Sequence, residues 1–340
     1  MELHSESWGR FTVVGGESVE ARLRELVSAV GAAVARTARP GEILALLVIG
    51  GYGRGEGGVD RSKQGEERPH NNIDFLAVTP QRWGSTQRLK ARLDAAVLPL
   101  EAEFGLGFDL SVTSLGRLQR SPSLVIWYDI RFGHKTVWGD PELFARFGHF
   151  RVERIPSWDV RNLLTNRGTL LLINEHMRAH SDAPDQRQLI RHGVKATIGY
   201  GDALLYFLGD YHWSYVEKRR RMQRRDDVSP AFRELYDDAM AFRFAPDYAR
   251  IEAKGVSDWL ARLQAALEPV HRRCEELRLG ASGWSWDDYL ALALRRELSD
   301  DALDPAQWAR KLVRAGRALG QRRHGQVLAA ARAGAGLAGG

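Results

Sequence analysis

A glycine-rich run and three polar side chains stand out as residues whose types and spacing could do chemistry. Residues 50–56 read Gly-Gly-Tyr-Gly-Arg-Gly-Glu and directly follow an apolar stretch, and Asn72 and Asp74 come after a polar insert. Asp109 lies near the start of a third apolar segment. Backbone N–H groups of a glycine turn can bind phosphate, and carboxylate oxygens are the ligands that Mg²⁺ prefers. The pattern therefore predicts a phosphate-binding turn beside a metal-binding position.

Three segments must position these groups, and each carries the apolar, β-branched pattern of a strand: 43–49, 73–78 and 108–113. Residues two apart on a strand point to the same face of a sheet, so Asn72 and Asp74 are expected to lie side by side. The polar, glycine-rich segment 51–71 is predicted to be a loop, and residues 137–141 are predicted to be a turn.

The rest of the chain is predicted to be helical. Apolar residues at helical spacing indicate helices over 17–38 and 86–104, and 123–132 is a shorter candidate. From residue 158 onward the sequence has helical patterns and no good strand: 158–179, 185–208, 229–242, 246–278, 286–297 and 305–322.

The predicted fold class is α+β, with a mixed β-sheet and flanking helices followed by an all-α helical bundle. We expect one domain over residues 1–155 and a helical domain over 156–328. The last residues, 329–340, are rich in alanine and glycine and are expected to form a disordered tail.

The bulk composition is that of an ordinary soluble protein, with 340 residues, 44% hydrophobic and 27% charged. No run of eighteen apolar residues and no secretory signal is visible, and the single cysteine, Cys274, can form neither an internal disulfide nor a zinc site. We therefore expect a cytoplasmic protein without a membrane partner. The net charge of +6 indicates an anionic partner, or only the arginine-rich composition of a GC-rich bacterial genome.

The combination of turn and acids resembles the active-site signature of the polymerase-β-like nucleotidyltransferases. That signature is a glycine pair after a strand, Asp-x-Asp on the next strand and an acid on a later strand. Gly50 and Gly51 match the pair, Asp74 matches the second acid and Asp109 matches the third. The run 50–56 is particularly similar to the turn of the uridylyl- and adenylyltransferases of glutamine-synthetase regulation.

The resemblance covers roughly residues 43–145 and implies a nucleotidyl-transfer site. It implies two Mg²⁺ ions and an NTP, with ATP as the default donor and AMP as the transferred group. The implied catalytic and metal-binding residues are Asn72, Asp74 and Asp109. Asp109 is the expected base toward an acceptor hydroxyl.

The nucleotide-binding candidates are Gly50, Gly51, Tyr52, Arg54 and Lys195. Tyr52 and Arg54 are equally consistent with a packed tyrosine and an exposed loop arginine. Lys195, on a predicted helix of the second half, is also consistent with a solvated helix face.

Asn72 departs from the pattern, because an aspartate is expected at the first metal-binding position. An amide oxygen can coordinate Mg²⁺ but lacks the charge of a carboxylate, and the loss of such a ligand weakens transition-state stabilisation. Three explanations stay open: a natural pseudoenzyme that still binds nucleotide, an engineered change, or a substitute acid in the insert. The substitute acids would be Asp60, Glu66 and Glu67.

Two alternatives to an active enzyme follow. The first is a catalytically inactive nucleotide-binding regulatory protein, which Asn72 favours. The second is an RNA-binding module that uses the basic run 218–225. For an active enzyme the acceptor is a small molecule, a protein side chain or RNA.

Overall fold

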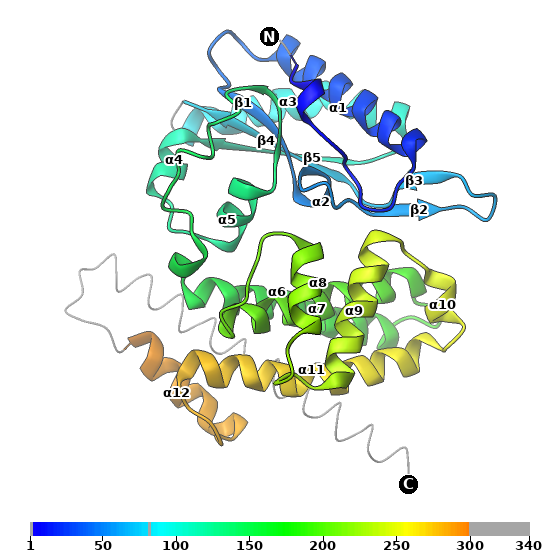
Figure 1. The fold of residues 1–340 in the computed structure, drawn as a ribbon, viewed down its shortest axis with the longest axis vertical. Coiled ribbons are helices and arrows are strands. Elements are labelled where there is room, and N and C mark those ends of the chain that lie inside the picture. Colours follow the sequence, from blue (N-terminus) through cyan, green and yellow to red (C-terminus); the bar gives the residue numbers. More distant parts are fainter. Residues whose placement is uncertain (1–2, 81–82, 299–340) are drawn as a thin grey trace. The chain divides into compact units, whose positions relative to one another are not determined.

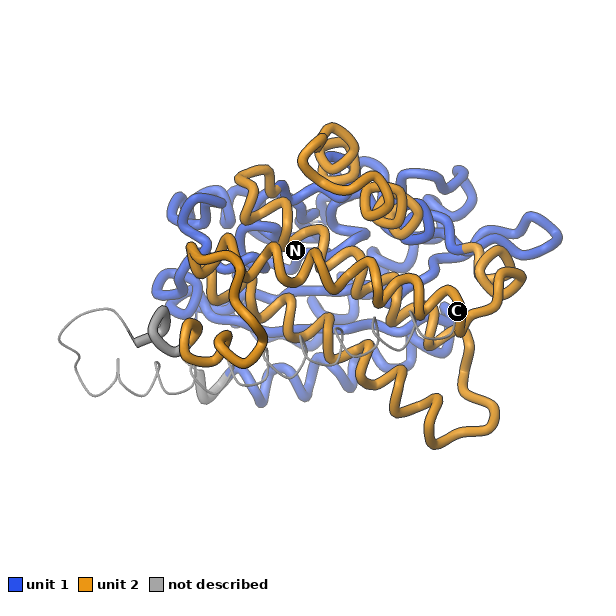
Figure 2. The backbone as a smooth tube through the Cα atoms, turned by 90° about the horizontal axis from the view of Figure 1, so that it is seen from below, with its two compact units in different colours: residues 1–156, 212–217, 241–246 blue, residues 157–211, 218–240, 247–340 orange. Residues whose placement is uncertain are grey.

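The computed structural model describes residues 3–80 and 83–298, which divide into two compact units (Figure 2). Unit 1 contains Met1–Pro156, and unit 2 begins at Ser157. Two short later segments, His212–Glu217 and Ala241–Pro246, are grouped with unit 1, although a linear division at residue 155 assigns them to the helical domain. The predicted helix 305–322 and the predicted tail lie outside the described residues.

The fold class is α+β, as predicted, and unit 1 is built on a four-stranded mixed sheet with the strand order β5-β4-β1-β6 (Figure 1). The strands are β1 (Ala45–Ile49), β4 (Ile73–Thr79), β5 (Phe108–Ser114) and β6 (Lys135–Gly139). Strand β1 pairs antiparallel with β4 and β6, and β4 pairs parallel with β5. The three predicted strands are therefore present.

Strand β6 corrects the prediction of a turn over 137–141. The local signals, a glycine and a proline, mark only the end of this strand, where Gly139 has a φ of +95°. The strand forms because its backbone pairs with β1, from which it is separated by most of unit 1 in sequence. Local sequence does not encode such a pairing.

Helices cover both faces of the sheet. Helices α1 (Glu17–Thr37) and α3 (Trp83–Phe104) pack on one face, where they enclose Phe75 and its same-face neighbours. Helices α4 (Leu115–Arg120) and α5 (Val125–Phe132) pack on the other face, over Leu76 and Val78. Since side chains alternate along a strand, Asp74 belongs to the same face as Leu76.

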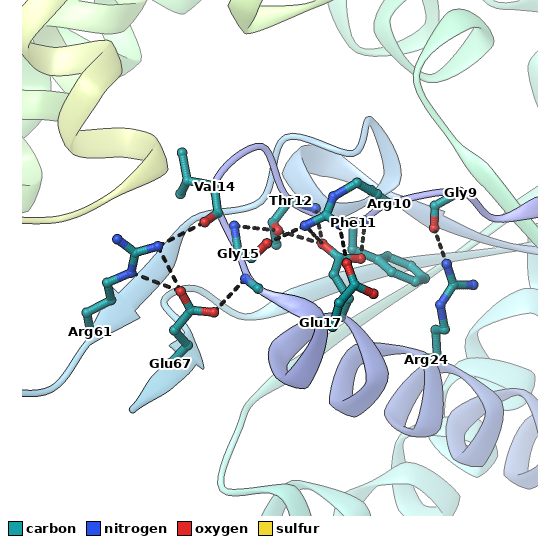
Figure 3. A network of polar contacts seen from close by, with 12 residues as sticks. Gly9, Arg10, Phe11, Thr12, Val14, Gly15, Glu17, Arg24, Arg61 and Glu67 are labelled. Carbon is teal, nitrogen blue, oxygen red and sulfur yellow. Dashed lines mark hydrogen bonds and ion pairs between the residues drawn. The ribbon is translucent and has the colours of Figure 1, made fainter. Parts of the chain in front are cut away.

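The predicted loop 51–71 is also corrected, because it contains a helical turn, α2 (Gly50–Gly53), and a hairpin of β2 (Val59–Arg61) and β3 (Glu67–Pro69). Strands of three residues are too short for a periodic signal. Long-range polar contacts hold them instead (Figure 3): Glu67 accepts a hydrogen bond from the Gly16 N–H at 2.6 Å and one from Arg61 at 2.9 Å. Arg61 also donates to the Val14 carbonyl at 3.0 Å.

Unit 2 is helical, and no strand is found in its described residues. Its elements, two of which begin or end in segments grouped with unit 1, are α6 (Ser157–Ala179), α7 (Gln186–Phe207), α8 (Tyr215–Gln223), α9 (Pro230–Phe244), α10 (Tyr248–Glu252), α11 (Val256–Leu279) and α12 (Trp286–Leu298). Helix α7 is buried along most of its length and packs against α6 and α11. The predicted helix 246–278 is two helices, because Gly255 interrupts it with a φ of +79°. None of the helices in the described ranges has the length and apolar character needed to span a membrane.

Candidate active site

The strand register brings the two predicted aspartates together. Asp74 and Asp109 are direct partners on the parallel strands β4 and β5, and Asp74 also pairs with Ile49, the last residue of β1. Neighbouring strands lie about 4.8 Å apart, and partner residues point to the same face. Asp109 is exposed and Asp74 is partly buried, so the two carboxylates lie side by side at an accessible edge of the sheet.

Asn72 lies on the same face, next to these acids. A Cβ atom added to Gly107 would lie 2.9 Å from Asn72 Oδ1, so the amide occupies the space that this glycine leaves. The Ile73 N–H donates to the Gly107 carbonyl at 3.1 Å, which continues the β4–β5 ladder to this point. Asn72 precedes Asp74 by two residues, and Gly107 precedes Asp109 by two residues. Because side chains alternate along a strand, Asn72 and the space at Gly107 lie on the same face as the two aspartates. The structure therefore gathers all three predicted metal-binding side chains.

These three side chains form an all-oxygen donor set of two carboxylates and one amide, which is the chemistry that suits a hard divalent cation. No group of three or more His, Cys, Asp or Glu side chains that could hold a metal ion is found in residues 3–80 and 83–298. In the insert, Glu66 pairs with Arg68 at 2.8 Å and Glu67 pairs with Arg61. Two of the three candidate substitute acids, Glu66 and Glu67, are thus engaged within the hairpin itself.

Gly50 packs directly against the Asp74 carboxylate. A Cβ atom at position 50 would collide with Asp74 Oδ2, and the residue has a φ of +67°, which L side chains rarely adopt. Glycine is thus required at this position for two independent reasons. The Glu56 N–H donates to the Gly51 carbonyl at 2.8 Å and closes the turn.

Tyr52 follows within the turn but is buried, and its hydroxyl is used inside the protein. It donates to the Gly58 carbonyl at 2.8 Å and accepts from the Asn71 N–H at 3.4 Å. Burial raises the pKa of Tyr52 to about 12, so the phenol stays neutral. Tyr52 joins both ends of the insert and thereby supports the position of the neighbouring Asn72.

Arg54 forms a buried ion pair instead of facing an open site. Its Nη2 atom lies 2.5 Å from Asp129 Oδ2, and the two side chains are 8% and 10% exposed. A direct contact between Arg54 and phosphate would require this pair to open. Lys195 belongs to unit 2, where it lies exposed on α7, whereas the other predicted site residues belong to unit 1.

Sequence reasoning missed a second layer of side chains that surrounds the turn, formed by residues from 54–56 and by three later residues, Ser214, Tyr215 and Arg243. Glu56, which is only 6% exposed, accepts hydrogen bonds from Ser214 Oγ and from the N–H of Tyr215 at 2.8 Å. The guanidinium groups of Arg54 and Arg243 stack on the Tyr215 ring, with their Cζ atoms 4.6 Å and 3.9 Å from the ring centroid. All of these residues belong to unit 1.

Part of this layer had a sequence signal. Ser214 and Glu217 have the spacing of a capping box, and the Glu217 N–H donates to Ser214 Oγ at 3.1 Å. The start of α8 was therefore predictable. Arg243 carries no signal, since it is one of many arginines in the chain.

A comparison with known proteins finds a partial sequence similarity. The chain is similar to the bifunctional uridylyltransferase/uridylyl-removing enzyme of Novosphingobium aromaticivorans, with 29% identity over 244 residues. These residues are 69% of this chain and 22% of that protein, so the chain spans about a fifth of the relative's length. No family model matches the chain.

Proposed function

We propose that this chain is a metal-dependent nucleotidyltransferase that moves a nucleoside monophosphate from an NTP, with ATP as the default, to an acceptor hydroxyl. The observation that carries the proposal is the pairing of Asp74 with Asp109 beside Gly50, where no Cβ atom fits. The similarity to a uridylyltransferase/uridylyl-removing enzyme supports the same class of reaction.

The proposed reaction assigns a separate role to the turn glycines and to the three oxygen-bearing side chains. Gly50 and Gly51 would let the backbone approach the phosphates closely, and Asp74, Asp109 and Asn72 would hold the two Mg²⁺ ions. When bound there, Mg²⁺ supplies charge neutralisation for the triphosphate and activation of the attacking oxygen. The acceptor oxygen bonds to the α-phosphorus, the bond to the bridging oxygen breaks, and pyrophosphate leaves. Asp109, the exposed carboxylate, accepts the proton of the acceptor hydroxyl.

Tyr52 and Arg54 are assigned a supporting role here. The Tyr52 hydroxyl and the Arg54 guanidinium already have buried partners within unit 1. They hold the insert and helix α5 against the turn, and any contact with nucleotide is indirect. Lys195, which is exposed on α7 of unit 2, is proposed to contribute to nucleotide binding as a further cation.

Asn72 favours one alternative function, a nucleotide-binding regulatory protein without turnover. The present site carries two carboxylates where the resembling enzymes have three. The substitution Asn72→Asp restores the third charge and distinguishes the two functions, because a site impaired only at this residue gains activity.

The test is a calorimetric titration of ATP, with and without Mg²⁺, against the unchanged chain and the Asn72→Asp variant. We expect Mg²⁺-dependent binding that is tighter in the variant, and Asp74→Asn is the control that must lose it. An absence of binding in both proteins would refute the proposed site. Binding in the variant without any release of pyrophosphate in an acceptor screen would favour the regulatory protein.

The acceptor is proposed to be a small molecule or a protein side chain, and internal ion pairs argue against RNA. Within the basic run 218–225, three side chains pair with carboxylates of unit 2: Lys218 with Asp202 at 2.5 Å, Arg219 with Asp237 at 2.6 Å, and Arg225 with Asp210 at 2.5 Å. Their charge is thus largely neutralised within the protein. Tight RNA binding that survives Asp74→Ala would reverse this assignment.

A further inference from the structure

A cation lies beside the glycine turn, at a position that the sequence did not indicate. The Nη2 atom of Arg243 is 3.0 Å from the point where a Cβ atom of Gly51 would stand. Burial raises the pKa of Tyr52, Asp74 raises it further, and Arg243 lowers it. Both charges therefore act on the same phenol, which is part of the turn.

The guanidinium of Arg243 is held by an aromatic ring whose own position is fixed. It stacks on Tyr215 at 3.9 Å from the centroid, an arrangement that stabilises a cation. The Tyr215 N–H is bound by Glu56, and Arg54 stacks on the same ring. The run 50–56 thus shapes the turn with its glycines and, through Glu56, fixes the ring on which this cation stacks.

The guanidinium N–H donors of Arg243 differ from those of Arg54 and Arg219, which bind carboxylates of the protein. Its Nε atom is buried and makes no hydrogen bond to any of the described residues. Arg54 and Arg219 have carboxylate partners at 2.5 and 2.6 Å, whereas no ion pair to Arg243 is found in that part of the chain. A guanidinium offers five N–H donors in a planar fork that matches phosphate oxygens.

We propose that Arg243 binds the phosphate chain of the nucleotide at the Gly50–Gly51 turn, with Tyr215 and Glu56 as its positioning residues. The identity of the ligand rests on the proposed function. The role of Arg243 rests on its own contacts. The arginine also adds a positive charge to a site in which Asn72 has removed a negative one, so the site is suited to retain triphosphate.

The experiment compares Arg243→Gln with the unchanged chain in titrations of ATP, AMP and adenosine, each in the presence of Mg²⁺. Arg187→Gln is the matched control, because Arg187 also stacks on a tyrosine, Tyr248, at 4.9 Å but belongs to unit 2. We expect Arg243→Gln to weaken ATP binding about 10–100-fold, the range of a hydrogen bond to a charged group. The affinity of Arg243→Gln for AMP should fall less than its affinity for ATP, and its affinity for adenosine should not change. The control Arg187→Gln should change ATP affinity less than twofold.

Two results would overturn the role of Arg243. One is ATP binding by Arg243→Gln that equals that of the unchanged chain, which leaves the proposed function standing. The other is an equal loss for ATP and adenosine, which indicates a general distortion of the site. If the unchanged chain binds no ATP at all, the proposed function itself fails. Arg243→Lys should recover part of the affinity, and Glu56→Gln should weaken ATP binding through the displaced Tyr215.

Discussion

Replacement of Gly50 by alanine tests the contact on which the candidate site depends. The residue has a φ of +67°, and an alanine held in this left-handed region costs about 1–2 kcal/mol. The reduced freedom of the unfolded chain offsets about 0.4–1 kcal/mol of this cost. The expected net loss in the free energy of unfolding is therefore about 1 kcal/mol. In addition, the new Cβ atom would displace the Asp74 carboxylate.

Gly41 provides a matched control, because it has a φ of +74° and nothing within 4 Å of the position of a Cβ atom. Gly41→Ala should lose about 1 kcal/mol in urea unfolding, from its backbone conformation alone, and keep the ATP affinity of the unchanged chain. Gly50→Ala should lose about 10–100-fold in Mg²⁺-dependent ATP affinity, the usual effect of a displaced partner at a metal site. If both variants bind ATP alike, the packing of Gly50 against Asp74 does not support the site, and the reasoning fails.

Three further predictions address charge. Asn72→Asp should tighten Mg²⁺-dependent ATP binding in calorimetry and raise pyrophosphate release, because it restores a carboxylate; weaker binding would contradict the assignment of the metal site. Arg54→Met should lower the free energy of urea unfolding by about 3–5 kcal/mol, since it leaves Asp129 buried without its cation, and the double change with Asp129→Leu should recover part of the loss. Burial lowers the pKa of Lys135 to about 8 from 10.5 in the unfolded chain, so between these values the unfolded state binds more protons. Stability measured by urea unfolding should therefore rise with pH across this window, and Lys135→Met should flatten the rise.

Much of the sheet could be predicted, because its strands carry strong local patterns. The apolar run that ends at Ile49 lies buried or half-buried on the sheet. The segment that contains Asp109 alternates between exposed positions, Asp109 and Ser111, and buried or half-buried ones, so in both segments the pattern of hydrophobicity reflects the environment directly. The hairpin of the insert could not be predicted, because its strands are short and polar. It depends on Glu67, which binds the distant Gly16.

The candidate site was partly predictable for the same reason. Gly50, Gly51, Asp74 and Asp109 could be recognised because their types are dictated by chemistry and by backbone geometry. Arg54 could not be placed from sequence, since a buried arginine and an exposed one look alike until the partner, Asp129, is known.

The sequence by itself determined which chemical groups are available: a turn that only glycine can form, two carboxylates at the starts of strands and an amide in place of a third acid. Only the tertiary structure decided that Asp74 and Asp109 share one register, and that Glu56 binds a backbone N–H 159 positions further along the chain. The physical reason is that turns and strand patterns arise from neighbouring residues, whereas the packing of the whole unit decides which distant side chains meet. Arg243 illustrates this difference, because its place beside Gly51 and on the Tyr215 ring is a tertiary contact that its sequence neighbours do not indicate.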